Sequence, residues 1–356
     1  MPTVITAENI QQYETGTFKS VVKVRWEAGR LDPCILANFP NLEVLDVSNQ
    51  QPSLETLEGI EVCTRLKTLD CSHNQLVSLS GIEGLVCLES LDCSHNLVCV
   101  SRMANIYLGL RSLAGLEESV YLRYINCECN SIETLEPLIN CLRIEKLICS
   151  YNRLTSLLGI GVALRLRSIV CDYNQLTALA SMANGNRLEM LSCRGNELAT
   201  LHGLEECIQL QILVCDHNKL VTLEGLAKRA IVHTLYCNYN RLVSLLGIEH
   251  CSQLVFLNCG DNRLTVLTGI ESCVQLKTLY CGHNDLRSIE PISYCTQLIR
   301  LSCSHNHLES LQGIEGCSKL RELYCTWNRL VTLAGVDSCL KLRKFEYHLK
   351  HAESVG

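Results

Sequence analysis

Residues 254–276, LVFLNCGDNRLTVLTGIESCVQL, are the unit from which most of the chain is built. They follow the pattern L-x-x-L-x-C-x-x-N-x-L-x-x-L-x-G-I-E-x-C-x-x-L, after which the pattern starts again. An unbroken period of this kind predicts a solenoid, in which each repeat packs only against its neighbours. The asparagine marks the period of 22 residues, at Asn130, Asn152, Asn174, Asn196, Asn218, Asn240, Asn262, Asn284, Asn306 and Asn328, with a matching pair upstream at Asn74 and Asn96.

The first apolar residue of each L-x-x-L unit counts the turns of the solenoid. Two intervals differ from 22: Leu42 to Leu66 is 24 residues and Leu88 to Leu122 is 34. The second interval indicates an insertion of 12 residues (34 minus 22) within about residues 98–112. Fourteen turns are predicted, starting at Leu42, Leu66, Leu88, Leu122, Ile144, Leu166, Leu188, Leu210, Val232, Leu254, Leu276, Leu298, Leu320 and Leu342.

Both ends of the chain depart from the period. Residues 21–26 alternate as a strand does, and the apolar pattern of residues 31–42 is interrupted by Pro33 and Pro40. End repeats of a solenoid must close off an apolar stack, so atypical sequence is expected there. We therefore predict an N-terminal cap over residues 1–41, the solenoid over 42–341, and a last strand with a C-terminal cap over 342–356.

Each residue type in the repeat has a structural reason. The two leucines and the cysteine of L-x-x-L-x-C can all point inward from a short strand that enters and leaves a turn of the coil. The asparagine amide can satisfy backbone groups that the following turn leaves unpaired, so stacked repeats would form an asparagine ladder. Glycine marks a tight return on the opposite side, where either a Cβ atom would be crowded or φ is positive. The few remaining residues predict short helical or 3₁₀ turns.

This pattern, over about residues 42–349, resembles the leucine-rich repeat family. It is most similar to the intracellular 22-residue class that includes the regulatory leucine-rich repeat subunits of protein phosphatase 1 and bacterial internalins. The resemblance implies an α/β solenoid: a right-handed horseshoe with a parallel β-sheet on its concave face and short 3₁₀ or turn segments on its convex face. Family members bind proteins through the concave sheet. Because cysteine replaces the third apolar strand position, the phosphatase is not carried over as a partner.

Twenty of the 24 cysteines fall on two ladders that follow the repeat. A row of zinc ligands is one interpretation, but inward positions between leucines leave little room for tetrahedral coordination. Cysteine as a small core hydrophobe is favoured. The thiols are then reduced, which predicts a reducing, cytoplasmic location. The four cysteines outside the ladders, Cys34, Cys87, Cys99 and Cys129, are the candidates for reactivity. The first ladder comprises Cys71, Cys93, Cys127, Cys149, Cys171, Cys193, Cys215, Cys237, Cys259, Cys281, Cys303 and Cys325. The second comprises Cys63, Cys141, Cys207, Cys251, Cys273, Cys295, Cys317 and Cys339.

Composition and charge narrow the class of partner. The net charge of −6 argues weakly against nucleic acid, since phosphate binding needs local positive charge. The N-terminal residues lack the pattern of a secretory signal, and no stretch reaches the length of an apolar membrane span. We therefore expect no nucleic acid and no membrane insertion.

Two columns of residues repeat outside the core. One lies immediately before each asparagine and holds histidine at His73 with His95 and at His283 with His305, which would be roughly 5 Å apart on adjacent turns. A metal site or a pH-sensitive surface is conceivable there, but a stacked rim is favoured.

The other column is the outward strand position between the second leucine and the cysteine. It changes from acidic residues, through aliphatic residues, to tyrosine along the chain. A strip of exposed apolar and aromatic side chains predicts a contact surface, although drift on an inert sheet is the alternative. Ile212 and Phe256 extend the apolar part of this strip from a neighbouring strand column, and Trp327 belongs to the column before each asparagine. The predicted partner-binding residues are Ile148, Val170, Ile212, Val214, Tyr236, Phe256, Tyr280, Tyr324 and Trp327.

Catalysis finds little support in the sequence. No nucleophile elbow, phosphate-binding glycine loop or H-E-x-x-H motif is present. We therefore predict a protein-interaction scaffold that is not an enzyme and needs no cofactor or metal. An architectural component of a larger assembly, such as the particle of a large DNA virus, is the alternative, and a metal-dependent enzyme is a more distant one.

Overall fold

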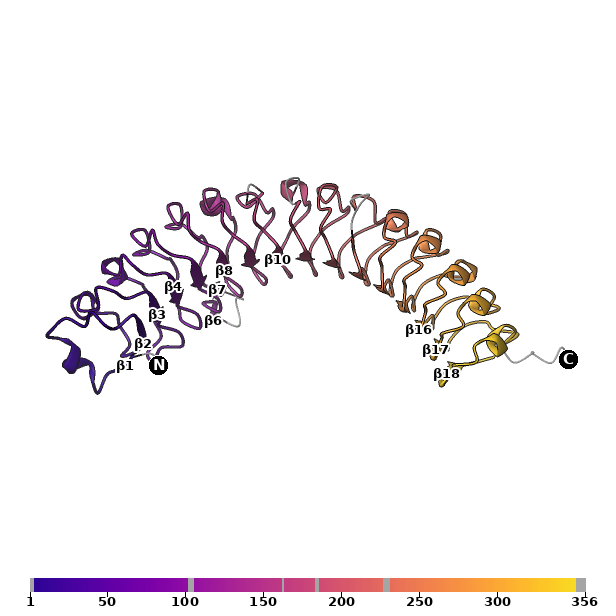
Figure 1. Ribbon diagram of the computed structural model, residues 1–356, viewed down its shortest axis with the longest axis horizontal. Coiled ribbons are helices and arrows are strands. Elements are labelled where there is room, and N and C mark those ends of the chain that lie inside the picture. Colours follow the sequence, from indigo (N-terminus) through magenta and orange to yellow (C-terminus); the bar gives the residue numbers. More distant parts are fainter. Residues whose placement is uncertain (1–2, 102–105, 162, 183–185, 227–230, 350–356) are drawn as a thin grey trace. The chain divides into compact units, whose positions relative to one another are not determined.

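One short strand per turn forms the sheet of the coil, as the 22-residue period predicts. The computed structural model describes residues 3–101, 106–161, 163–182, 186–226 and 231–349. Two units are present, residues 1–176 and 177–356. Within each unit the strands line the concave side and the 3₁₀ turns lie on the convex side (Figure 1). The predicted leucine-rich solenoid with a parallel sheet and short 3₁₀ returns is confirmed.

The first unit contains the N-terminal segment, the first strands of the sheet and one hairpin. Its strands pair in the order β1-β2-β3-β4-β5-β8-β9-β10. The elements are β1 (Thr3–Thr6), η1 (Ile10–Tyr13), β2 (Lys23–Glu27), α1 (Pro33–Leu36), β3 (Val44–Asp46), η2 (Ile60–Val62), β4 (Thr68–Asp70), β5 (Ser90–Asp92), β6 (Val98–Ser101), β7 (Ile106–Leu108), β8 (Tyr124–Asn126), η3 (Glu136–Leu138), β9 (Lys146–Ile148) and β10 (Ser168–Val170).

The second unit continues the same repeat without a break in the strand order from β11 to β18. Residues that lie opposite each other on neighbouring strands are 22 residues apart in sequence, which is one repeat, as in Phe256 opposite Thr278. The elements are η4 (Ala180–Met182), β11 (Met190–Ser192), β12 (Ile212–Val214), β13 (Thr234–Tyr236), η5 (Ile248–His250), β14 (Phe256–Asn258), η6 (Ile270–Ser272), β15 (Thr278–Tyr280), η7 (Glu290–Tyr294), β16 (Arg300–Ser302), η8 (Ile314–Gly316), β17 (Glu322–Cys325), η9 (Val336–Ser338) and β18 (Lys344–Tyr347).

The asparagine ladder is formed as predicted, and Asn262 shows its geometry. Its amide nitrogen donates to the carbonyl oxygens of Cys259 at 3.2 Å, of Gly260 at 2.9 Å and of Cys237 in the preceding turn at 3.0 Å. Its amide oxygen accepts from the N–H of Leu242 at 2.9 Å. One side chain therefore satisfies backbone groups of two consecutive turns, which would otherwise be left without partners where each strand ends.

The return glycines adopt the predicted positive φ. Gly247 has φ of 105° and precedes η5 as its N-terminal cap residue, and its N–H donates to Glu249 Oε2 at 2.7 Å. A Cβ atom at Gly247 would lie 2.4 Å from the carbonyl carbon of Leu223 in the preceding turn. Glycine is needed here because the backbone is left-handed and because the turns approach each other closely. The glutamate of G-I-E has a structural role that the repeat pattern alone did not reveal.

An aromatic cluster closes the N-terminal end of the first unit. The rings of Tyr13, Phe18 and Phe39 lie 5.2 to 5.7 Å apart between centroids. Ile5, which points inward from β1, and Trp26, which points inward from β2, are fully buried. The strand predicted at residues 21–26 is confirmed as β2, whereas β1 was not predicted.

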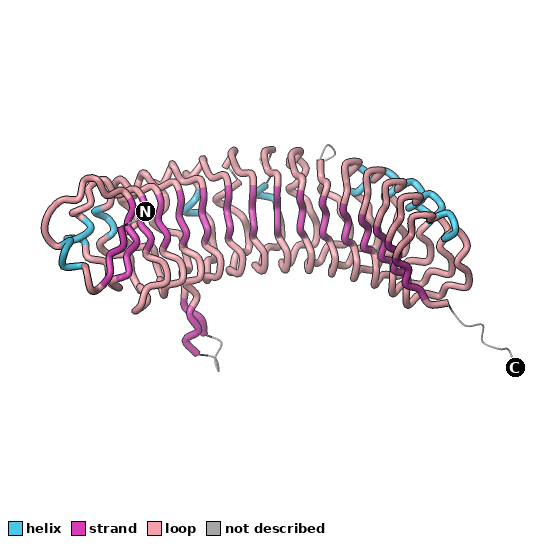
Figure 2. The backbone as a smooth tube through the Cα atoms, turned by 60° about the horizontal axis from the view of Figure 1, so that its bottom comes forward, coloured by secondary structure: helices cyan, strands magenta, loops and turns pink. Residues whose placement is uncertain are grey.

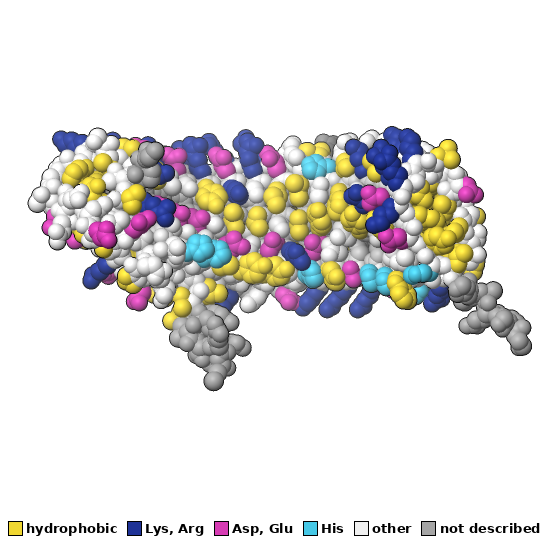
Figure 3. All heavy atoms as spheres, turned by 90° about the horizontal axis from the view of Figure 1, so that it is seen from below, with side chains coloured by type: hydrophobic (Ala, Val, Ile, Leu, Met, Phe, Trp, Pro, Cys, Tyr) yellow, Lys and Arg dark blue, Asp and Glu magenta, His cyan; other side chains and the backbone are white. Residues whose placement is uncertain are grey.

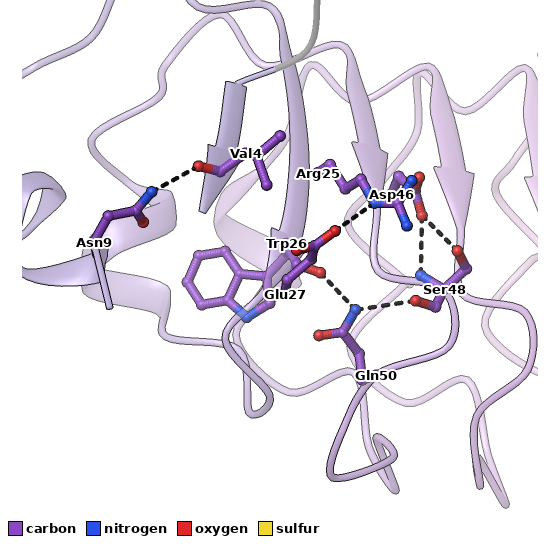
Figure 4. Close-up of polar contacts among 8 residues, drawn as sticks. All are labelled: Val4, Asn9, Arg25, Trp26, Glu27, Asp46, Ser48 and Gln50. Carbon is purple, nitrogen blue, oxygen red and sulfur yellow. Dashed lines mark hydrogen bonds and ion pairs between the residues drawn. The ribbon is translucent and has the colours of Figure 1, made fainter. Parts of the chain in front are cut away.

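Gln50 replaces asparagine in the first turn of the ladder. Its side-chain nitrogen donates to the carbonyl oxygens of Trp26 and Ser48, as Figure 4 shows. Its own backbone N–H donates to Asn74 Oδ1 at 3.2 Å, so the ladder extends one turn before the first asparagine. Glutamine was not expected there because only asparagine defines the repeat.

The insertion predicted within residues 98–112 forms an antiparallel pair of strands, β6 and β7. Figure 2 shows this hairpin standing off from the coil of the first unit. Residues 102–105 of the insertion lie outside the described residues. The strands on either side of it, β5 and β8, pair in regular parallel register, so the insertion leaves the sheet unbroken.

The last turn of the second unit differs from the turns before it. In the preceding turn Leu320 and Leu323 are fully buried, whereas the corresponding Leu342 and Phe345 are half-exposed. Leu340 has 90% of its surface exposed. Among the described residues, therefore, the apolar interior is open at the β18 end.

Candidate interaction surface

Side chains of alternate strand residues point away from the coil interior and form the concave surface. In β14 the inward Leu257 is fully buried, whereas Phe256 and Asn258 on either side of it are half-exposed. The same burial pattern recurs in most strands of the sheet, because side chains alternate between the two faces of a strand. The outward positions are therefore free to differ between repeats without altering the core.

Three aromatic side chains on consecutive strands form the central feature of this surface in the second unit. We refer to Tyr236 of β13, Phe256 of β14 and Tyr280 of β15 as the aromatic patch. The ring of Phe256 lies 4.7 Å from that of Tyr236 and 5.7 Å from that of Tyr280, between centroids. All three are half-exposed. The sequence placed Phe256 in a neighbouring column, and the structure brings it between the two tyrosines.

Aliphatic side chains extend the patch toward β12. Val214 is directly opposite Tyr236 in the register of β12 and β13, and Ile212 is opposite Thr234. Both β12 residues are half-exposed. Figure 3 views the strand side, where hydrophobic side chains gather along the band of strands. The predicted residues of β12 to β15 therefore lie on one continuous surface.

A bidentate ion pair bounds the aromatic patch on its other side. Arg300 of β16 donates from Nε and from a terminal nitrogen to the carboxylate of Glu322 of β17, at 2.7 and 3.0 Å. The hydrogen bonds from Arg300 hold the pKa of the Glu322 carboxyl below its ordinary value. Tyr324, on the same strand as Glu322, donates to Glu322 at 3.4 Å. The predicted Tyr324 is two strands from Tyr280, with Ser302 of β16 between them in the register.

Trp327 does not lie on the concave strand surface. It belongs to the column before each asparagine, which we call the rim column, and is 65% exposed. Its ring stacks at 5.6 Å on His305, which in turn stacks at 4.1 Å on His283. His305 has its pKa lowered by desolvation and by the neighbouring His283. The predicted adjacency of histidines is confirmed here, and also for His73 and His95 at 4.4 Å in the first unit.

The rim column has a backbone property that the sequence interpretation missed. Its residues other than glycine have φ between 51° and 55°, in the left-handed region that side chains rarely adopt. A signal for this was present, because Gly195 and Asp261 occur in the column and such residues tolerate positive φ. The non-glycine residues are Asn49, His73, His95, Cys129, Tyr151, Tyr173, His217, Tyr239, Asp261, His283, His305 and Trp327.

The first unit contributes the other two predicted contact residues, Ile148 of β9 and Val170 of β10. These are directly opposite each other in the register and half-exposed, so they form a small aliphatic surface. Three outward aspartates precede them along this unit, Asp46, Asp70 and Asp92 on β3, β4 and β5. Desolvation and the charges of its two neighbours raise the pKa of the Asp70 carboxyl, against the opposing hydrogen bonds from Ser72.

Both cysteine ladders line the interior, as predicted. Every ladder cysteine is buried, and burial raises the pKa of the Cys207 thiol, for example, to about 12. Thiols in this state are poor nucleophiles and poor metal ligands. Of the four remaining cysteines, Cys34 is exposed and Cys87 and Cys129 are half-exposed. The side chain of Cys99 lies outside the described residues. Within the described ranges, no group of three or more His, Cys, Asp or Glu side chains is arranged to hold a metal ion.

Comparison with known proteins agrees with this architecture. The family model described as leucine-rich repeats in two copies matches residues 64–101. A leucine-rich repeat protein from Leptospira interrogans is 18% identical with a TM-score of 0.77, covering 99% of this chain and 96% of that one. The functional domain of InlJ from Listeria monocytogenes, which includes a cysteine ladder, is 23% identical with a TM-score of 0.67, covering 89% of this chain and 70% of that one.

A plant receptor provides a solved complex with a similar fold. The leucine-rich repeat ectodomain of the receptor kinase GASSHO1/SCHENGEN3 from Arabidopsis thaliana, in complex with CASPARIAN STRIP INTEGRITY FACTOR 2, is 18% identical with a TM-score of 0.66. The match covers 98% of this chain and 46% of that one. No curated protein sequence matches the chain. With the 22-residue strand spacing, these findings show that the chain has the leucine-rich repeat fold.

The sequence also predicted no membrane insertion, no nucleic-acid partner and a cytoplasmic location. In the part of the chain that the structure describes, no helix has the length and apolar character needed to span a bilayer. The exclusion of nucleic acid and the cytoplasmic location stay predictions.

Proposed function

We propose that this chain is a protein-interaction scaffold that binds a protein partner through the concave surface of its second unit, centred on the aromatic patch. The observation that carries the proposal is the contact of Tyr236, Phe256 and Tyr280 on three consecutive strands, half-exposed on a surface that the fold leaves open. Large aromatic side chains contribute most of the binding energy at protein interfaces because they bury much area and have few rotatable bonds.

The chemistry of the surface indicates the kind of segment that it accepts. Between β12 and β15 the outward positions are aliphatic, aromatic, threonine or asparagine, so the surface there carries no formal charge. The adjacent Arg300 and Glu322 neutralise each other. A partner segment would therefore present apolar side chains to the rings and hydrogen-bonding groups to the two tyrosine hydroxyls. Strong charge on that segment would find no complement in the aromatic patch.

The similar structures support protein binding in general, although not a particular partner or surface. The plant receptor was solved with a bound partner, CASPARIAN STRIP INTEGRITY FACTOR 2. Leucine-rich repeat domains in general present a rigid sheet whose side chains can change without disturbing the core. The graded outward columns of this chain follow that principle, because the interior repeats and the surface does not.

The test compares two triple variants that remove the same kind of side chain from two surfaces. One replaces Tyr236, Phe256 and Tyr280 by alanine, and the other replaces the rim tyrosines Tyr151, Tyr173 and Tyr239 by alanine. Wild-type and variant chains serve as baits in extracts of the native host, and captured proteins are identified by mass spectrometry. The proposal expects a partner that is retained by wild type and by the rim variant and is lost from the patch variant.

Circular dichroism of each bait controls for folding. Capture of the same proteins by a folded patch variant would rule out the concave surface of the second unit as the binding site. Loss of capture from the rim variant alone would place the contacts on the rim column.

A further inference from the structure

The first and last strands of the sheet, β1 and β18, differ in how well their inward side chains are buried. At the β1 end the inward Ile5 is fully buried, and Tyr13, Phe18 and Phe39 pack together near the terminus. At the β18 end the inward Phe345 is half-exposed. A terminal repeat of a solenoid normally ends in a polar outer face, because an open apolar stack associates with other chains. In the described residues, only the first end follows that rule.

Several apolar side chains of the last turn share this exposure. Leu333, Val336 and Leu342 are half-exposed, although their equivalents one turn earlier are fully buried. Leu340 is 90% exposed and Tyr347 is 41% exposed. The ring of Tyr347 stacks on that of Phe345 at 4.5 Å between centroids. Together these residues form an apolar end surface of the kind that marks an interaction site.

The backbone of β18 determines how a further strand could pair with it. The N–H of Lys344 donates to the carbonyl oxygen of Arg321 at 3.0 Å, on the β17 side. The carbonyl oxygen of Glu346 also faces β17, where it accepts from Cys325 Sγ at 3.5 Å. Because backbone groups alternate along a strand, the N–H and C=O of Phe345 between them point to the outer edge. Two such strands can pair antiparallel with Phe345 opposite Phe345, each donating to the other.

In that register, oppositely charged side chains of the two β18 strands face each other. With Phe345 opposite its copy, Lys344 of one chain lies opposite Glu346 of the other, and the reverse pair forms by symmetry. Directly opposite residues of an antiparallel pair have their side chains on the same face, so both pairs can form. Within one chain Lys344 Nζ already lies 3.3 Å from Glu346 Oε1, so the two side chains share a face. The sequence Lys-Phe-Glu is thus self-complementary about its centre.

We propose that two copies of the chain associate through β18, with the strands antiparallel about a twofold axis at Phe345. The pairing extends the sheet across the interface and covers the open apolar interior of both chains. An isologous contact of this kind closes on itself and gives a dimer and not a fibre. The occupant of the edge is a second copy, because the charge pattern of β18 matches its own reversed sequence. This contact is independent of the aromatic patch and of any partner bound there.

The test measures the mass of the full chain in solution by sedimentation velocity over a range of concentrations. The expected result is a reversible dimer of twice the 39.8 kDa chain mass. K344E is expected to weaken the dimer roughly tenfold, because it puts two carboxylates opposite each other at both symmetric positions. E346K should weaken it similarly by opposing two ammonium groups. The double variant K344E/E346K restores opposite charges across the axis and should recover the wild-type dissociation constant.

Four results would overturn the proposal. The first three are a wild-type chain that stays monomeric at the highest soluble concentration, a dimer whose dissociation constant is unchanged in both single variants, and a double variant no better than the single ones. The fourth is a mass that keeps rising with concentration, since this indicates a head-to-tail assembly. Lys344 and Glu346 have exposed side chains, so the variants are expected to fold, and circular dichroism checks this.

Discussion

The strands β3 to β5 and the strands β13 to β15 have the same interior and opposite surfaces. In both sets the central residue of the strand is a fully buried leucine. The inward residue two positions later is buried as well, and it is cysteine in every strand except β3, where it is Val47. The outward positions are Asp46, Asp70 and Asp92 in the first set. In the second set they include the aromatic patch. The comparison shows that the coil depends on its inward residues and that a contact surface can be changed strand by strand.

The largest effect is expected from a change that breaks the common interior. Asn262→Ala removes the hydrogen bonds to Leu242, Cys237, Cys259 and Gly260. Buried backbone groups without partners each cost on the order of 1 to 3 kcal/mol, and water reaches part of this site, so we expect a loss of about 3 kcal/mol in the free energy of unfolding. Urea denaturation followed by circular dichroism measures it.

The matched control for this change is Asn258→Ala in the same repeat. Asn258 faces outward, and its side-chain oxygen accepts a hydrogen bond from the N–H of Gly260 at 3.2 Å. Its replacement should cost less than about 1 kcal/mol. Equal losses for the two variants would contradict the distinction between interior and surface positions.

A smaller effect is expected on the convex side, where both regions use a glycine of positive φ. Gly247→Ala would place a Cβ atom 2.4 Å from the backbone of Leu223 and would force alanine into a left-handed conformation. We expect a loss of about 2 kcal/mol in the free energy of unfolding. At Gly84, by contrast, the nearest atom to a new Cβ is 3.8 Å away. Gly84→Ala should therefore change the unfolding midpoint in urea little, and a comparable loss at both glycines would refute this explanation.

The smallest effect is expected on the acidic surface of the first unit, where the charge of Asp70 makes the free energy of unfolding depend on pH. The raised pKa of Asp70 means that the folded chain binds this proton more tightly than the unfolded chain, whose carboxyl has the ordinary value of 3.8. Ionisation of Asp70 therefore destabilises the fold as the pH rises through the folded pKa, and below 3.8 the penalty disappears. Asp70→Asn keeps an acceptor for Ser72 and removes the charge.

Near neutral pH, Asp70→Asn is expected to raise the free energy of unfolding by less than about 1 kcal/mol, because partial exposure limits both the desolvation of the Asp70 carboxylate and its repulsion by the neighbouring aspartates. The gain should vanish at a pH below 3.8. Denaturant titrations of both proteins at the two pH values measure the difference. A gain that is the same at both pH values would show that ionisation of Asp70 is not its cause.

The repeat predicted the interior of this molecule almost completely, because the same physical constraint acts in every turn. Leu257, Cys259, Asn262 and Gly269 each occupy a position that the coil can satisfy in one way, so their period is sufficient to place them. Features that occur once were harder. Gln50 in the ladder and strand β1 were not predicted, because no periodicity marks them.

The candidate site was predicted in part for a related reason. Alternation along a strand placed Tyr236 and Tyr280 on the outward face, and adjacent strands brought them toward Phe256. The sequence did not reveal the ion pair of Arg300 with Glu322 beside this patch, because an ion pair depends on side-chain conformation as well as on register. It also grouped Trp327 with the concave strip, although Trp327 lies in the rim column.

The backbone conformation of the rim column limits which amino acids can occupy it. A positive φ is costly for β-branched residues and is incompatible with proline, whose ring holds φ negative. None of the twelve non-glycine residues in the column is valine, isoleucine, threonine or proline. Asparagine, aspartate, histidine, cysteine and the larger aromatics share the position instead. A library built to give this scaffold new specificities could therefore vary the rim freely within that restricted alphabet, and should exclude β-branched residues from it.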